Sequence, residues 1–333
     1  MSPSLSRRHL LFAGGAAALG VACRNPAGEP GMLRLGLVAS LSHGPALASL
    51  RAGTLAQALA PLRIEARLFR AGPRVVEALV GGAVDIGITG PAPVVATHSR
   101  HGGRLLRVLA GVASGGASLV VRRGAPVTEP RDLRGRAVAV TQVGNTQDIS
   151  LRTWLAAAGV VPKDRGGDVT VYALAAPVIK GEMAKGNLDA AWLPEPWGTR
   201  LVQEIGATRL LDERALWPDG LFATAIAVAR TDFLAARGPD VERALAVLRT
   251  EGERARLEPA RTEELAYEEI RTRTGNAGPR KAFREAMAYV DFTEDCMQEP
   301  IARFAQQASA TGLFPPAEVA SLFAAGARPR LET

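Results

Sequence analysis

The stretch "AVAVTQVGNTQDISLRTWL", residues Ala137–Leu155, contains the most informative transition in the chain. It begins with a short apolar run and continues through the small polar residues 144–147. Apolar residues then recur at helical spacing from Ile149 to Leu155. The stretch therefore predicts a strand, a short loop and a helix N-terminus. Such a terminus has unpaired backbone N–H groups and a positive dipole end, so the segment is either an anion-binding site or a well-capped helix.

The same alternation of strand and helix extends in both directions. Strand-like runs at 33–39, 62–69, 83–89, 105–112, 169–174 and 188–193 are separated by helical patterns. This order predicts an α/β protein with mostly parallel sheets. The alternation breaks at 113–126 and at 220–231, and the spacing beyond Thr231 is helical. We therefore predict two lobes, lobe 1 from 33–114 and 221–333 and lobe 2 from 115–220, with a ligand cleft between them.

Residues 75–93 and 178–196 are weakly similar to each other. Each reads as a helix, a glycine, an apolar residue, an aspartate, a strand and a Pro-containing turn, and Asp85 and Asp189 differ by one position in register. This likeness predicts two lobes of similar construction.

Composition excludes some classes of partner. The chain has 333 residues, of which 47% are hydrophobic and 22% charged, with a net charge of +7. The basic residues are mostly scattered arginines without a basic block, which disfavours nucleic-acid binding. A mildly positive surface is suited to attracting a small anion.

Residues 1–22 are typical of an export signal. Arg7 and Arg8 precede an apolar run of residues 10–22, too short for a bilayer, which takes about 20 residues. "SRRHLLF" resembles the twin-arginine signal, and "LGVAC" resembles a lipoprotein processing site. We predict an extracytoplasmic protein with a spacer at 23–32 and a lipid anchor at Cys23; the alternative is cleavage nearby, with Cys23 free or removed.

Four loops are expected at the ligand-binding edge of the sheets, because ligands of open α/β sheets bind beyond the carboxyl ends of the strands. They are residues 40–44 and 89–92 in lobe 1, and 144–147 and 192–197 in lobe 2. The candidate ligand contacts in them are Ser40, Ser42, His43, Thr89, Gly90, Asn145, Thr146, Gln147, Trp192 and Glu195.

The donors in these loops are hydroxyls, amides and backbone N–H groups, without Lys or Arg. This set suits a weakly hydrated anion whose charge is spread over several oxygens. Trp192 and Trp197 would supply apolar walls. Structural alternatives remain open: Asn145 or Thr146 as a helix cap, Trp192 as a core residue, and Glu195 as a helix-start residue.

Four motifs carry a family resemblance: "VEALVGGAVDIGITGPAPVV", "DLRGRAVAV", "GNTQDISLRTWLAAAGV" and "LDAAWLPEPWGTRLV". In this order they resemble the solute-binding proteins of ABC importers for nitrate, sulfonates and taurine. The resemblance implies a type II periplasmic binding fold, hinge closure over the ligand, and delivery to a permease with its ATPase subunits. It also implies ligand contact at Thr89, Gly90, Asn145 and Thr146. From the two breaks in the alternation we expect the mature protein to be a two-lobed monomer.

Two alternatives stay open. The same fold binds a thiamine-precursor pyrimidine in some proteins, for which Glu195 with Trp192 and Trp197 would serve, and it is reused by some enzymes. The sequence contains no Ser/His/Asp order, P-loop or CxxC motif, and no carboxylate or cysteine accompanies His98 and His101. We therefore expect no catalytic activity, no cofactor and no metal.

Overall fold

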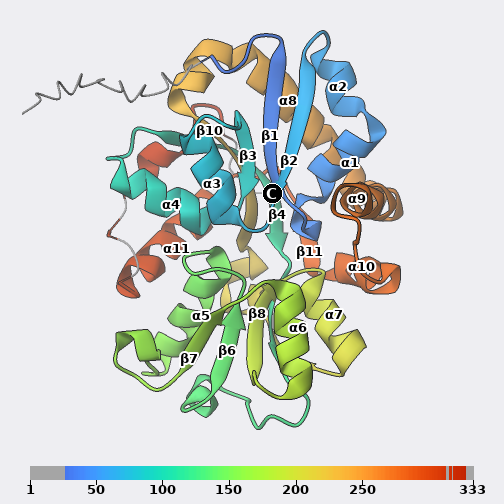
Figure 1. Cartoon of the computed structure of the whole chain (residues 1–333). Coiled ribbons are helices and arrows are strands. Elements are labelled where there is room, and N and C mark those ends of the chain that lie inside the picture. The colour runs from blue at the N-terminus through green and yellow to red at the C-terminus, as the bar shows by residue number, and fades with distance from the viewer. Residues whose placement is uncertain (1–26, 313–314, 317, 328–333) are drawn as a thin grey trace, which may run out of the picture.

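The computed structural model describes residues 27–312, 315–316 and 318–327. They form two lobes, each built on one sheet with helices on both faces (Figure 1). The expected export signal and the lipid-anchor residue Cys23 lie outside the described residues.

Lobe 1 contains a six-stranded sheet. Its strands, in spatial order, are β11 (Val290–Phe292), β4 (Leu106–Gly115), β10 (Ala223–Arg230), β3 (Ile86–Thr89), β1 (Met32–Val38) and β2 (Arg63–Phe69). Strand β1 pairs in parallel with β2 and β3, whereas β10 runs antiparallel between β3 and β4. One face packs on α1 (Gly44–Ala52), α2 (Thr54–Leu59), α8 (Thr231–Leu257), α9 (Pro259–Thr274) and α10 (Arg280–Ala286). The other face packs on α3 (Gly72–Val80), α4 (Pro91–Arg100) and α11 (Gln298–Ala310).

Lobe 2 contains a five-stranded sheet. Its strands, in spatial order, are β7 (Thr170–Ala173), β6 (Ala137–Val140), β8 (Ala190–Pro194), β5 (Ala117–Val121) and β9 (Thr208–Asp212). Helix α5 (Thr146–Ala157) covers one face, while α6 (Ala176–Lys185) and α7 (Trp197–Ile205) cover the other. Short 3-10 helices complete the fold: η1 (Leu41–His43), η2 (Pro130–Leu133), η3 (Lys163–Arg165), η4 (Glu213–Leu216), η5 (Pro218–Gly220), η6 (Met287–Tyr289) and η7 (Ala320–Leu322).

The two lobes share one plan. In each sheet the central parallel strand lies between two parallel neighbours, β2-β1-β3 and β7-β6-β8, and an antiparallel strand follows. In each lobe an aspartate before the third strand accepts a backbone N–H of the central strand: Arg34 donates to Asp85 at 2.8 Å and Ala137 donates to Asp189 at 3.2 Å. The similar segments 75–93 and 178–196 therefore form equivalent parts of the two lobes.

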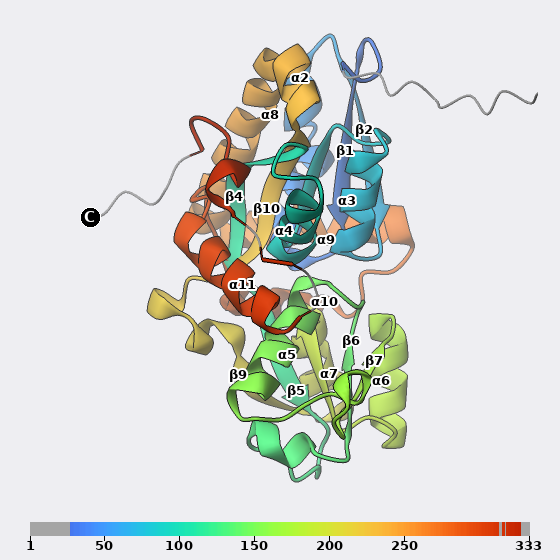
Figure 2. The same ribbon diagram turned by 90° about the vertical axis from the view of Figure 1, so that its left-hand side faces the viewer.

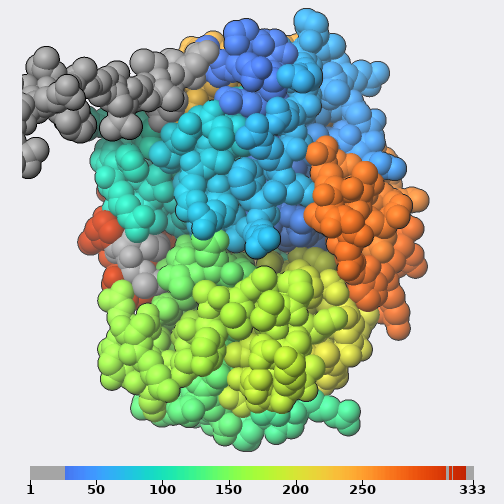
Figure 3. All heavy atoms as spheres, viewed as in Figure 1, coloured from blue at the N-terminus to red at the C-terminus, as the bar shows by residue number. Residues whose placement is uncertain are grey.

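The chain passes between the lobes twice. Strand β4 leads into β5 through Gly115 and Gly116, with φ of 70° and 73°, and the return runs through η4 and η5 into β10. A Cβ at Gly115 would lie 2.9 Å from the Tyr289 carbonyl oxygen, so glycine is needed for space as well as conformation. In space-filling view the two lobes meet along a seam (Figure 3), and Figure 2 shows α11 near α5 at this junction.

One helical segment is interrupted, and one local prediction differs from the structure. Between β1 and β2, Gly53 takes a left-handed φ of 74° and separates α1 from α2. The C-terminal region is not wholly helical, because β11 adds an edge strand to the lobe 1 sheet. Three residues are too few to show a strand period, so this strand could be found only from its pairing with β4.

Candidate functional site

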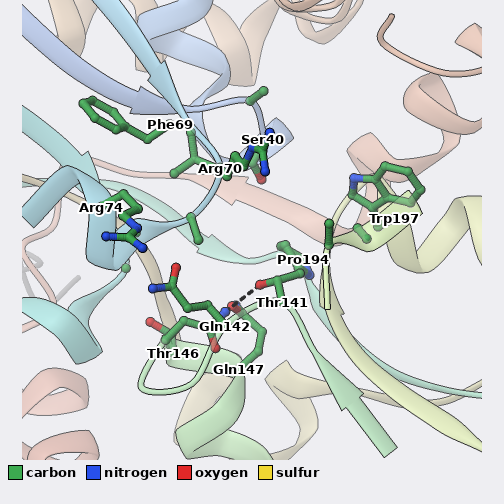
Figure 4. A pocket seen from close by; sticks show the side chains of 18 of the residues that line it. Ser40, Phe69, Arg70, Arg74, Thr141, Gln142, Thr146, Gln147, Pro194 and Trp197 are labelled. Atoms are coloured by element: carbon green, nitrogen blue, oxygen red, sulfur yellow. Dashed lines mark hydrogen bonds between the residues drawn. The ribbon is translucent and has the colours of Figure 1, made fainter. Parts of the chain in front are cut away.

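A cleft between the lobes has a volume of about 1190 Å³ and is lined by both of them (Figure 4). It lies at the carboxyl ends of six parallel strands, β1, β2 and β3 in lobe 1 and β6, β7 and β8 in lobe 2. Helices α1, α3, α4, α5, α6 and α7 follow these strands, and each has its N-cap or first residue in the lining. Six positive dipole ends therefore converge on one space.

The structure brings most of the predicted site residues to this cleft. Those that line it are Ser40, Ser42, His43, Gly90, Asn145, Thr146 and Gln147. Thr89, Trp192 and Glu195 do not line it.

The N-terminus of α5 combines a capping residue with unpartnered donors. Asn145 is the cap: its Oδ1 accepts the Asp148 N–H at 2.8 Å, and its Nδ2 donates to Thr141 Oγ1 at 2.7 Å. The Thr146 side chain is buried, yet its Oγ1 has no hydrogen-bond partner among the described residues. In the same part of the chain the N–H groups of Thr146 and Gln147 have no acceptor either. One residue caps the helix, and the next two have donors without partners among the described residues.

Gly90, the N-cap of α4, faces Thr146 across the lobes. A Cβ at Gly90 would collide with Thr146 Oγ1 and would lie 3.4 Å from the Thr224 carbonyl oxygen. Its φ of −71° is ordinary for any residue. Glycine is required here because the lobes leave space for nothing larger.

Ser40 joins the lobes at another point. Its Oγ donates to the main-chain oxygen of Glu195 at 3.0 Å, and the Leu41 N–H donates to the same oxygen at 3.2 Å. The Ser40 hydroxyl also lies 3.1 Å from Ser42 Oγ. The first loop of lobe 1 thus closes against the β8–α7 loop of lobe 2.

His43 contributes a neutral donor to the wall. Its Nδ1 accepts the Val38 N–H at 3.3 Å, which leaves the proton on Nε2. Burial lowers the pKa of His43 to about 3. The imidazole is therefore uncharged at neutral pH.

Arginine lies in the cleft wall, which corrects the expectation of a site without Lys or Arg. Arg70 and Arg74 come from the β2–α3 loop and α3, and Figure 4 shows both side chains at the wall. Arg74 pairs with Glu77 at 2.6 Å, whereas Arg70 makes no ion pair or hydrogen bond within the described residues. The sequence signal for Arg70 is that β2 ends at this edge like β1 and β3, although the loop after β2 does not contain small polar residues like those of loops 40–44 and 144–147.

Trp192 belongs to the core of lobe 2. It is fully buried, donates its Nε1–H to Glu213 Oε2 at 2.7 Å and meets Trp154 edge-on at 6.1 Å. Alternation along β8 turns its side chain toward α5 and away from the cleft. The tryptophan of the wall is Trp197, the first residue of α7.

The Glu195 carboxylate also lies behind the wall. Its Oε1 pairs with Arg209 Nη1 at 2.5 Å, and its Oε2 accepts the Thr199 N–H at 3.0 Å. Burial raises the pKa of Glu195, and Arg209 acts against that rise. Thr89 is buried too: a Cβ on Gly72 would lie 2.5 Å from its Oγ1, and Thr89 is not part of the lining.

Comparison with known proteins agrees with this architecture. The family model described as NMT1-like matches residues 26–267. The chain belongs to the NMT1-like family.

Curated relatives of this NMT1-like chain are binding proteins. It is 28% identical over 183 residues to the taurine-binding periplasmic protein of Escherichia coli (strain K12), which covers 55% of this chain and 54% of that protein. It is 32% identical over 96 residues to the nitrate/nitrite binding protein NrtA of Nostoc sp. (strain PCC 7120), covering 28% of this chain and 21% of that protein. The chain therefore matches about half the length, or less, of these relatives.

Solved structures share the fold more completely. The alkanesulfonate-binding protein SsuA from Xanthomonas axonopodis pv. citri, bound to MOPS, superposes with a TM-score of 0.71 at 22% identity, over 90% of this chain and 99% of that one. The periplasmic aliphatic sulphonate binding protein SsuA from Escherichia coli gives 0.71 at 21% identity, over 89% and 98%. The fold is that of a two-lobed type II periplasmic binding protein. Within the described residues, no helix combines the length and apolar character needed to cross a membrane.

Proposed function

We propose that this chain is the solute-binding component of an ABC importer and captures a small organic anion between its lobes. The observation that carries the proposal is the unpartnered hydroxyl of Thr146, buried at the N-terminus of α5 beside two backbone N–H groups without acceptors. An anion placed there gains hydrogen bonds and the helix dipole together. The names of the relatives, which concern taurine and nitrate, support a small ligand with an oxyanion group.

The two lobes would act at different stages of ligand capture, because their donors differ. Arg70 is exposed at the wall of lobe 1 and attracts the anion in the open form. Closure then brings the α5 donors of lobe 2 to the bound anion, while Gly90 lets the lobes approach and Ser40 joins them. Closure removes water from the cleft, and the hydrogen bonds to the anion strengthen in the lower dielectric.

The closed protein would act outside the cytoplasm, as a monomer anchored at a lipidated Cys23. There it would deliver its ligand to a membrane permease that works with ATPase subunits. Mass spectrometry of the membrane fraction tests the anchor. A lipid-modified N-terminus is expected, and Cys23→Ser should release the protein into the soluble fraction. Wild-type protein found soluble and cleaved elsewhere contradicts this part of the proposal.

Two other functions fit less well. A cationic or neutral pyrimidine would need a free carboxylate, and the one carboxylate among the lining residues, Glu77, is paired with Arg74. General-base catalysis works best with a base poised near neutral pH, and the one imidazole among the lining residues, His43, has its pKa lowered to about 3. We therefore propose a binding protein without catalytic activity.

A ligand screen tests the proposal. Purified protein is heated with alkanesulfonates, taurine, nitrate or an aminopyrimidine, and small-angle scattering is recorded with the best ligand. At least one anion should raise the melting temperature and contract the particle, as hinge closure requires. Stabilisation by the pyrimidine alone, or no response to any anion, contradicts the proposal.

A further inference from the structure

We infer that the ligand of this cleft carries one negative charge and an uncharged apolar tail, and that the cleft rejects ligands bearing an ammonium group. The inference rests on the proposed function and names the substrate class of the same site. It separates this chain from a taurine-type specificity, because taurine is a zwitterion with an ammonium group two carbons from its sulfonate.

The lining offers an ammonium group no unpaired carboxylate. Among the residues of the lining, Glu77 is the one acidic side chain, and Arg74 holds it at 2.6 Å. Glu195 follows the lining residue Pro194 in the chain, but its carboxylate points away from the cleft and pairs with Arg209 at 2.5 Å. A buried ammonium group without a counter-charge is costly, so a zwitterion would lose affinity here.

Helix dipoles make the same space electropositive. Six helices of nine to twelve residues have their N-terminal ends in the wall, and five of them have no acidic residue in the first turn. The exception is Asp148 in α5, whose carboxylate accepts the Gly144 N–H and pairs with Arg152. Each positive end stabilises an anion and destabilises a cation.

The side-chain charges of the lining can balance one negative charge on the ligand. Arg74 is neutralised by Glu77 and His43 is uncharged, so Arg70 is the one cationic side chain of the lining without a partner among the described residues. Thr146 Oγ1, which is buried and unpartnered, marks where oxyanion oxygens are expected. A sulfonate, with one charge spread over three oxygens, suits this set of neutral donors and one guanidinium.

The remaining wall is apolar and the cleft is large. Leu68, Phe69, Pro177, Val178 and Trp197 all belong to the lining. Its volume of about 1190 Å³ exceeds what nitrate fills and lies somewhat above the range of small-molecule sites, about 300–1,000 Å³. An alkyl or aryl tail would occupy this space and bury apolar surface on closure.

A matched pair of ligands tests the inference. Propane-1-sulfonate has the length of taurine, with a methyl group in place of the ammonium group. Calorimetry at pH 7 should give an affinity for propane-1-sulfonate at least tenfold higher than for taurine. Nitrate, which lacks a tail, should bind more weakly than propane-1-sulfonate. Taurine binding as tightly as propane-1-sulfonate overturns the inference.

Glu195→Gln is the control that locates any ammonium site. Because Glu195 lies behind the wall, this variant should leave the ratio of the two affinities unchanged. A selective loss of taurine binding would show that Glu195 reaches the ammonium group, which contradicts the inference. If anions bind and close the lobes but taurine is preferred, the inference alone fails. If no anion binds, the proposed function fails and the inference falls with it.

Discussion

The two walls of the cleft differ in charge. The lining of lobe 1 includes Arg70, Arg74 and Glu77, whereas no residue in the lining of lobe 2 is charged. Two ion pairs of lobe 2, Arg209 with Glu195 and Arg152 with Asp148, involve side chains that are not part of the lining. The difference suggests a division of work: lobe 1 attracts an anion at long range, and lobe 2 binds it through uncharged donors once water is excluded.

The largest loss of affinity is expected from removing the lobe 2 donor. Thr146→Ala should weaken binding of an alkanesulfonate by about 1.5–3 kcal/mol, the range for hydrogen bonds to charged groups. The unfolding free energy should barely change, because the hydroxyl has no partner among the described residues to lose. Calorimetry and urea denaturation measure the two quantities.

Thr146→Ser is the matched control for this variant. It keeps the hydroxyl and should recover most of the lost affinity. If Thr146→Ala lowers stability and leaves affinity intact, the α5 terminus is only a capped helix and the ligand lies elsewhere.

The second-largest loss of affinity is expected when a side chain is added at the point where the lobes meet. Gly90→Ala places a methyl group against Thr146 Oγ1, and overpacking of this kind typically costs about 1–3 kcal/mol. The closed form should lose that amount, so affinity falls, while the open protein remains folded. Scattering with saturating ligand should then show less contraction than in the wild type.

Gly181→Ala is the control for Gly90→Ala. Gly181 lies within α6 of lobe 2, and a Cβ there meets nothing within 4 Å. Alanine should leave affinity unchanged and slightly stabilise the helix. Equal binding by the two glycine variants would mean that the lobes do not meet at Gly90 in solution.

A buried acid in lobe 2 and a buried base in lobe 1 should give stability opposite dependences on pH. Burial raises the pKa of Glu213 to about 8, and the Trp192 N–H opposes this rise. The folded state then keeps a proton that the unfolded chain has lost, so stability falls as pH rises from about 4.5 to 8, by at most about 1.4 kcal/mol per unit. His43, with its pKa lowered to about 3, does the reverse: stability falls as pH drops below about 6.5 toward 3.

Urea denaturation between pH 7 and 8 isolates the acid, because both folded and unfolded His43 are then mostly neutral. Glu213→Gln, which keeps an acceptor for Trp192, should flatten the slope there. An unchanged slope in the variant would assign the titration to another group.

Loss of the cap alone should have the smallest effect. Asn145→Ala removes the acceptor of the Asp148 N–H and should lower stability by about 1 kcal/mol. Affinity should change less than in Thr146→Ala, since the Asn145 side chain is occupied by Asp148 and Thr141. Denaturation measures the stability of both variants, and calorimetry measures their affinity. An equal loss of affinity in Asn145→Ala and Thr146→Ala would mean that the Asn145 side chain also binds the ligand.

Much of the fold could be predicted from the sequence, because apolar strand runs and helical periods alternate clearly in it. The strand–loop–helix of Ala137–Leu155 is an example, since its small polar loop and apolar spacing are both local signals. The likeness of residues 75–93 to 178–196 indicated the repeated plan for the same reason.

The site was less predictable because side-chain direction depends on distant partners. Glu195 turns inward to Arg209, which stands on another strand, and neither the pairing nor its direction is visible in the local pattern. Alternation along β8 places the Trp192 side chain on one face of the sheet. The alternation does not tell which face that is, and only the packing against α5 shows that it belongs to the core. Arg70 is hard to predict for a simpler reason, since the loop after β2 contains no small polar residue that would indicate a ligand-binding loop.

The salt dependence of binding tests the division between the walls most directly. The affinity for propane-1-sulfonate is measured at about 20 mM and about 500 mM salt, where screening lengths span roughly 20 to 4 Å, for the wild type, Arg70→Gln and Thr146→Ala. We predict that wild type and Thr146→Ala lose affinity in parallel as salt rises, with Thr146→Ala weaker throughout, and that Arg70→Gln is nearly independent of salt. A salt dependence in Arg70→Gln equal to that of the wild type, or one abolished by Thr146→Ala, would contradict an anion attracted by lobe 1 and held by the uncharged donors of lobe 2.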